Sequence, residues 1–414
     1  MAIEDDEPRD RETWSNVARF WYNKAADKSP TVGRLYHHLA ILARPYSLEQ
    51  LSLYTRALTC VTPFESARGS VMTLFKPILQ GTDRRLDTVF IRAHGYLFTM
   101  HHAKDDHQFV ATVHELEKVG VYDKYITKSG PKFKETGVYF ADSNIAALFE
   151  YGTPKQGRSK AILRLVYEDA RRIREEVSKF KDDQNMISQE VVNPELDSKT
   201  AVGLPNPDIE ALLLSDDDSV ATSISQASRL TAPILNASLK RSKDRNVYPL
   251  VNYYLAFFWS LILVQESCKY FEKAMVWKII ERDVPWLAIC LFLNDLAAEI
   301  PSMTQRVLAK VFPQTHSEKS RPLLEDFVLR GQLYALWLFP SNWFTETIVE
   351  DDERTHDPPS MAEYRTERIL WLGHRIASVC STMSIDCRCW LTEIDQSLDT
   401  LRLGDAAFRG YRLR

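Results

Sequence analysis

Two adjacent histidines and an arginine stand in one short run of the chain, and all three are residue types that bind acidic groups. The run is GRLYHHLAILARP, residues 33–45, with Arg34, His37 and His38. As a helix it places its leucines, alanines and tyrosine on one apolar arc and these three side chains on the other side. Adjacent helical residues point about 100° apart, so the two histidines cannot readily hold one metal ion. Two interpretations stay open: a solvated helix face, or a groove in which Arg34, His37 and His38 receive an acidic or phosphate group.

A second group of residues could bind nucleic acid. The segment 118–181 has fourteen Lys and Arg against eight Asp and Glu, with tyrosines and phenylalanines between them. Cationic side chains neutralise phosphates, and aromatic rings stack on unpaired bases. The predicted nucleic-acid-binding residues are Lys155, Arg158, Lys160, Arg164, Arg171, Arg172 and Arg174. The alternative is that EDARRIREE pairs its own charges at helical spacing.

Enzyme signatures are not found in this sequence. It has no glycine-rich phosphate loop, no G-x-S-x-G and no H-E-x-x-H. Glu325 and Asp326 are neighbours, so their carboxylates project about 100° apart on a helix, and Asp326, after Pro322, is predicted to begin a helix. The histidines of residues 94–114 and the cysteines of residues 380–389 lack the spacing of metal ligands. We therefore expect a protein that is not an enzyme and needs no metal or cofactor.

The elements that would position these residues are predicted to be helices. Glycine is scarce, 14 in 414 residues, and apolar residues recur at three- and four-residue spacing, which predicts an all-α fold. Only LVNYYLAFFWSLILV, residues 250–264, resembles a membrane span, but it is shorter than the ~20 residues required. We expect it to be a helix buried on all sides, and no membrane association. The predicted helices are 14–26, 32–43, 48–60, 65–79, 83–101, at least two within 106–150, and 159–181.

Composition divides the chain into four parts. Residues 182–218 hold ten acidic residues and one lysine, too little apolar surface to fold. Tyr22, Ala25 and Pro30 have the spacing of a tetratricopeptide (TPR) helix, and Tyr54, Ala57 and Pro63 repeat it approximately. The six mostly isolated cysteines favour thiols in a reducing compartment, the nucleus and/or the cytoplasm. The predicted parts are a TPR-like helical array (12–150), a basic helical extension (151–181), a disordered acidic linker (182–246) and a C-terminal α-helical domain (247–414).

Several stretches resemble a known family. WYNKAADKSPTVGRLYHHLAILA, followed by LYTRALTCVTPFESA, is similar to the core of the Est-one/SMG family of telomerase-associated proteins and nonsense-mediated mRNA decay scaffolds. Later stretches resemble, in the same order, the family's C-terminal helical region, a DNA/RNA-binding domain. They are LVNYYLAFFWSL, IERDVPWLAICLFLNDL, LLEDFVLRGQLYALWLFPSNWF and ERILWLGHRIAS.

The resemblance implies a scaffold. Its members carry a 14-3-3-like domain with TPR-type helices that can bind phosphorylated peptides, followed by a helical-hairpin domain. This chain begins almost at the WY motif, so the upstream part of the 14-3-3-like domain is expected to be missing, and no phosphopeptide-pocket residue is carried over. The expected function is a non-enzymatic adaptor that joins protein partners, such as decay or telomerase factors, to RNA or single-stranded DNA, in mRNA decay or telomere maintenance. The alternative is a purely protein-binding TPR-type scaffold without nucleic-acid contact.

Overall fold

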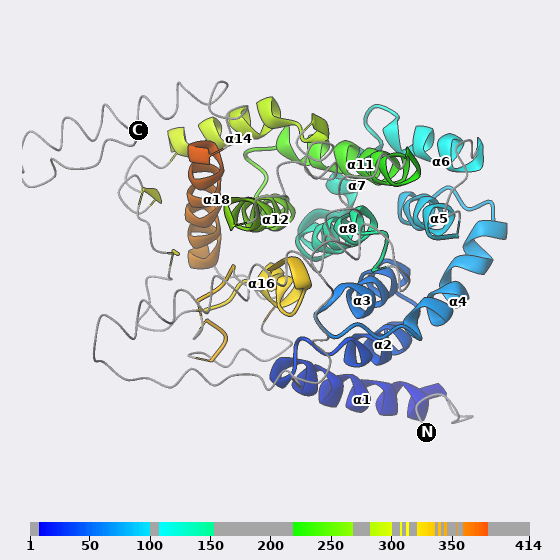
Figure 1. Cartoon of the computed structure of the whole chain (residues 1–414). Helices are drawn as coiled ribbons and strands as arrows, with labels where there is room; N and C mark the ends of the chain where they lie inside the picture. The colour runs from blue at the N-terminus through cyan, green and yellow to red at the C-terminus, as the bar shows by residue number, and fades with distance from the viewer. Residues whose placement is uncertain are drawn as a thin grey trace, which may run out of the picture.

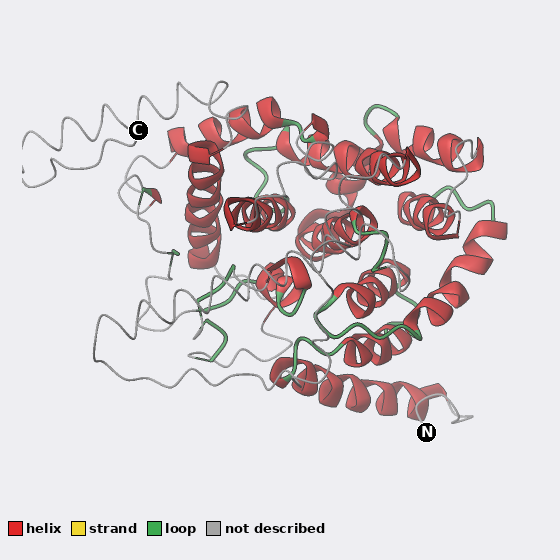
Figure 2. Cartoon of the chain, in the orientation of Figure 1, coloured by secondary structure: helices red, strands yellow, loops and turns green. Residues whose placement is uncertain are grey.

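In the computed structural model, the regular secondary structure of the described part of the chain is helical. These residues are 8–99, 107–152, 218–267, 282–299, 307–308, 312–313, 321–335, 338–340, 343–345, 354 and 359–379. Within them there are helices and loops but no strand (Figures 1 and 2), which confirms the all-α prediction. No helix in these ranges has both the length and the apolar character needed to cross a bilayer.

The N-terminal part is an array in which each helix packs on the next (Figure 1). It consists of α1 (Pro8–Lys28), α2 (Gly33–Leu42), α3 (Ser47–Thr59), α4 (Ala67–Gln80) and α5 (Leu86–Thr99). Ala40 and Ala57 are fully buried where helices cross, because a small side chain lets two backbones approach closely. Tyr36 and Tyr54 fill the space beside them, and the Tyr36 hydroxyl donates a hydrogen bond to the Pro30 carbonyl (2.6 Å).

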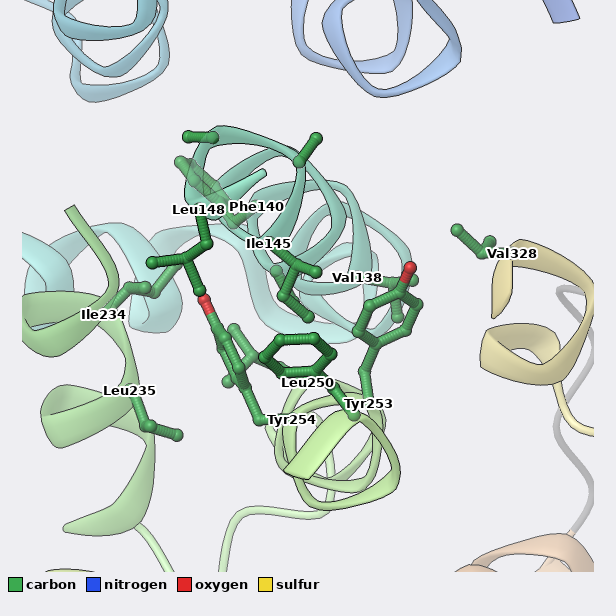
Figure 3. Packing of buried hydrophobic residues seen from close by; sticks show 14 of the residues in the cluster. Val138, Phe140, Ile145, Leu148, Ile234, Leu235, Leu250, Tyr253, Tyr254 and Val328 are labelled. Carbon is green, nitrogen blue, oxygen red and sulfur yellow. The ribbon is translucent and has the colours of Figure 1, made fainter. Parts of the chain in front are cut away.

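The array continues into a buried central helix. α6 (His107–Glu117), α7 (Val121–Ser129) and the short η1 (Gly130–Lys132) lead to α8 (Phe133–Leu148), which lies in the middle of the molecule (Figure 1). α8 packs against α3 on one side and against α11 (Asp218–Leu239) and α12 (Tyr248–Ser267) on the other. Figure 3 shows Val138, Ile145 and Leu148 of α8 facing Leu250 and Tyr254 of α12.

The predicted disordered linker, residues 182–246, extends too far toward the C-terminus, because it includes the helix α11. Residues 218–239 are helical, and Leu230, Ile234 and Leu235 are buried against the core. Apolar residues at three- and four-residue spacing give this segment a buried face even though it follows an acidic stretch. Residues 182–217 of the predicted linker, and residues 153–181 of the predicted basic extension, lie outside the described residues.

The C-terminal block packs onto the N-terminal array in one continuous hydrophobic core. α12 is buried on all sides from Leu250 to Ile262 except for a partly exposed Trp259, as its apolar sequence predicts. It is surrounded by α8, α16 and α18. The described elements of the block, besides α12, are α14 (Trp286–Glu299), α16 (Leu324–Leu329), η4 (Leu333–Ala335) and α18 (Pro359–Val379).

Polar contacts also fasten the block to the array. Thr59 donates a hydrogen bond to the Gln332 side chain (2.6 Å), and the Val61 amide donates to the Gly331 carbonyl (3.2 Å). Gly331 has φ +80°, and a Cβ there would overlap the Pro30 carbonyl oxygen, so this contact requires glycine. The N-terminal array and the C-terminal block are therefore held together by specific packing and hydrogen bonds as well as by the chain connection.

The cysteines only partly follow the prediction. Cys60 is a buried free thiol, and burial raises its pKa to about 12. Such a thiol behaves as a small core side chain, as expected. Cys290 is disulfide-bonded, so the prediction of thiols is wrong for this residue.

Candidate nucleic-acid interface

The predicted acidic-ligand groove on α2 is only partly open to solvent. Arg34 is exposed, and His38 is half-buried and stacks on the Tyr22 ring at 5.0 Å. His37 is only 8% exposed because its ring packs against Phe64 (4.9 Å) and Tyr54. The expectation that His37 faces solvent is therefore wrong. Burial lowers the pKa of His37 and of His38, which disfavours the cation that an acidic ligand would need.

The nucleic-acid-binding residues predicted from the sequence lie outside the described residues. They are Lys155, Arg158, Lys160, Arg164, Arg171, Arg172 and Arg174. The first part of the same basic segment, residues 118–152, is described: it follows α6 and contains α7, η1 and α8. In the structure, α7 of this segment packs against α11, which is distant in the sequence.

Two segments far apart in the sequence form a basic surface. α7 presents Lys124 and Lys128, one turn apart and both exposed, and Lys118 is exposed just before it. α11 packs on α7, and the loop from α11 to α12 begins at its end. We use the term basic surface for the six exposed cations of the two segments: Lys118, Lys124, Lys128, Lys240, Lys243 and Arg245.

Arg241 holds the two segments together. Its guanidinium donates a hydrogen bond to the Thr127 hydroxyl (2.6 Å) and lies 3.9 Å from Asp123 and 3.6 Å from Asp244. Nearby, Glu117 at the end of α6 accepts hydrogen bonds from Arg229 of α11, the shortest at 3.0 Å. The local carboxylates are thus engaged by arginines.

The six cations of the basic surface are left with no ion pair to any residue that the structure describes. Six exposed cations that form no ion pair with a described residue favour contact with phosphates. Four of six residues in KRSKDR, residues 240–245, are basic, and this signal was present in the sequence. It was missed because the run fell inside the predicted linker.

A buried carboxyl links three helices of the core. Asp142 of α8 accepts hydrogen bonds from Ser52 of α3 (2.5 Å) and from Tyr253 of α12 (2.7 Å). Burial is the main cause that raises the pKa of Asp142 to about 6. The Asp142 carboxyl therefore links the N-terminal array to α12. Near neutral pH its negative charge is poorly solvated because it is buried.

We predict that Asp142 makes the protein less stable as pH rises. Its folded pKa of about 6 exceeds the ordinary value of 3.8, so the folded state binds more protons between these values. Stability then falls as pH rises from about 4 to about 6, by roughly 2–3 kcal/mol from this group. Urea unfolding at pH 4 and pH 7 measures this, compared with Asp142→Asn, which keeps the shape without the charge. A stability difference between the two proteins that does not change with pH would contradict the assignment.

Glu325 and Asp326 are structural, as predicted for Asp326. The Asp326 carboxylate accepts hydrogen bonds from the Leu323 amide (2.9 Å) and the Trp343 indole (3.1 Å), so it caps the start of α16. It also pairs with Arg368 (2.5 Å), and Glu325 pairs with Arg365 (2.7 Å), all in the core. Both carboxylates are fully buried. No group of three potential metal ligands occurs in the part of the chain that the structure describes.

Comparison with known proteins places a family match on the N-terminal array. Residues 18–121 match the family model described as the Est1 DNA/RNA binding domain. The match runs from within α1 to the first residue of α7 and ends at the edge of the basic surface, whereas residues 247–414, where we predicted such a domain, lie outside it. No curated protein matches the chain. Over residues 18–121 the chain is similar to the Est1 DNA/RNA binding domain, which confirms its resemblance to the Est-one/SMG family.

Proposed function

We propose that this protein is a non-enzymatic adaptor that binds RNA or single-stranded DNA on its basic surface and protein partners elsewhere. The observation that carries the proposal is the meeting of α7 and the α11–α12 loop, with six exposed cations and no ion pair to a described residue. The match of residues 18–121 to a DNA/RNA-binding family supports it. The predicted contacts at 155–174 are part of the same proposal, as are roles in mRNA decay or telomere maintenance and a place in the nucleus and/or cytoplasm.

The chemistry of the surface favours binding through the phosphate backbone. Five of the six cations are lysines, which meet phosphates as point charges on flexible stems and do not read base edges. We therefore expect little base preference from this surface. Affinity should depend steeply on salt because each phosphate contact releases condensed counterions.

The test is a salt titration of the full chain with a labelled single-stranded RNA. With four to six phosphate contacts, the slope of log affinity against log salt should be about −3 to −4 for a single strand. Affinity should then fall on the order of 100-fold between about 50 and 200 mM salt. No binding at the lower salt concentration would refute the proposal.

One observation favours the alternative of a purely protein-binding scaffold. α1 exposes a row of large apolar side chains, of which Trp21 is 65% exposed and Val17 44%. Trp14, Val17 and Trp21 recur at helical spacing, which suits an amphipathic partner helix packed alongside α1. If the RNA titration shows no binding, this scaffold function is the one that remains. If RNA binds, α1 is the face we assign to the adaptor's protein partner.

A further inference from the structure

A cavity of about 380 Å³ lies where the N-terminal array meets α16, away from the basic surface. α1, α2, α3, α8 and α16 all contribute to its wall. Its apolar lining includes Leu39, Leu53 and Val328, and two tyrosines add aromatic surface. Its charged lining consists of Arg19, Arg56, Arg330, Arg354, Asp27, Glu49 and Glu135.

Three of the four arginines have carboxylate partners in the wall. Arg19 pairs with Glu49 (3.1 Å), and Arg354 pairs with Asp27 (2.5 Å). Arg330 lies 3.8 Å from the same Asp27. Asp27 and Glu49 are therefore paired with arginines of the wall. Glu135 instead accepts a hydrogen bond from the Tyr139 hydroxyl (2.7 Å).

Arg56 is different. It is 8% exposed, and its guanidinium lies over the Tyr36 ring at 4.1 Å. Nη2 donates a hydrogen bond to the Phe327 carbonyl (2.9 Å), but Nε is buried without a hydrogen-bond partner. Among the described residues no carboxylate is in ion-pair contact with it. Asp142 is close enough to interact through its charge, but that carboxyl is hydrogen-bonded to Ser52 and Tyr253.

No carboxylate of the described residues is in direct contact with this buried cation, and the cavity at its side offers room for one. We propose that this cavity binds a ligand through a single carboxylate held by Arg56, with the apolar part of the ligand against Leu39, Leu53 and Val328. A monoanion fits better than a phosphate dianion because three carboxylates already line the wall. The volume is at the lower end of the range of about 300–1,000 Å³ of small-molecule sites, so a small acid or one acidic peptide side chain would fill it.

This binding is independent of the proposed nucleic-acid function, and wild-type protein suffices to test it. Calorimetric titration of the full chain with benzoate should show saturable binding, with benzamide binding about tenfold more weakly or worse because it lacks the charge. Equal binding of the two probes, or no binding of benzoate at millimolar concentrations, overturns the proposal. Tighter binding of inorganic phosphate than of benzoate overturns the choice of a monoanion.

Two further experiments identify the kind of molecule that supplies the carboxylate and the residue that binds it. A capped tripeptide with a central glutamate, compared with its glutamine counterpart, shows whether a peptide supplies the carboxylate. Tighter binding of the glutamate peptide than of benzoate indicates a peptide, and the reverse a small acid. Arg56→Gln should remove most benzoate affinity, whereas Arg44→Gln, at an exposed arginine outside the cavity, should leave it unchanged. If Arg56→Gln does not fold, the preference for benzoate over benzamide decides the question alone.

Discussion

Replacing Asp326 with alanine is expected to lower the free energy of unfolding by about 3–5 kcal/mol. The carboxylate is fully buried and accepts hydrogen bonds from the Leu323 amide and the Trp343 indole. It is also the ion-pair partner of Arg368, whose guanidinium lies over the rings of Phe312 (4.6 Å) and Trp343 (5.0 Å). Alanine leaves that guanidinium charged in the core without its anion, and removes the cap of α16 at the same time.

Chemical denaturation monitored by circular dichroism measures the loss. The matched control is Asp283→Ala, which breaks an ion pair (2.8 Å) with the largely exposed Arg282 and should cost less than about 1 kcal/mol. The double variant Asp326→Leu/Arg368→Met should regain much of the lost stability, because no unpaired charge remains. A loss of under about 1 kcal/mol for Asp326→Ala would show that this ion pair does not stabilise the fold.

Reversing four charges of the basic surface is expected to weaken binding of single-stranded RNA by at least about 100-fold at low salt. The variant is Lys124→Glu/Lys128→Glu/Lys240→Glu/Lys243→Glu. Each lysine that contacts a phosphate of a single strand contributes about 0.7 units to the salt slope, so the slope should become shallower by about 3. These side chains are exposed and in no ion pair with a described residue, so the variant should stay folded.

The control reverses the same number of charges elsewhere. Lys28, Arg44, Lys76 and Arg84 are exposed on the N-terminal array, within the residues that match the family model. Reversing all four changes the net charge equally, so a threefold or smaller loss is expected from the long-range field alone, at about 0.65 kcal/mol. If this control loses as much affinity as the first variant, the binding site is not the basic surface.

The helices could be predicted from the sequence because their signal is local. α2, at Gly33–Leu42, and α3, at Ser47–Thr59, lie within a residue or two of the expected 32–43 and 48–60, since periodicity alone marks an amphipathic helix. α11 was missed because the acidic run just before it dominated the composition of the segment. The one continuous core could not be predicted, because it depends on which faces meet across the chain.

The candidate site could not be fully predicted either, because it also depends on contacts between residues far apart in the sequence. A helical wheel assigns His37 to the solvent side of α2, but Phe64, 27 positions further on, covers that side. The basic surface depends on the bond from Arg241 to Thr127, which joins residues 114 positions apart. The run KRSKDR was visible, but nothing local indicated that α7 lies beside it.

The most direct measurement is lysine acetylation of the protein with and without saturating single-stranded RNA, read by mass spectrometry. We expect Lys118, Lys124, Lys128, Lys240 and Lys243 to become protected together, while Lys28 and Lys76, exposed on the N-terminal array, react as before. Bound RNA that leaves α7 and the α11–α12 loop as reactive as in the free protein would contradict this expectation.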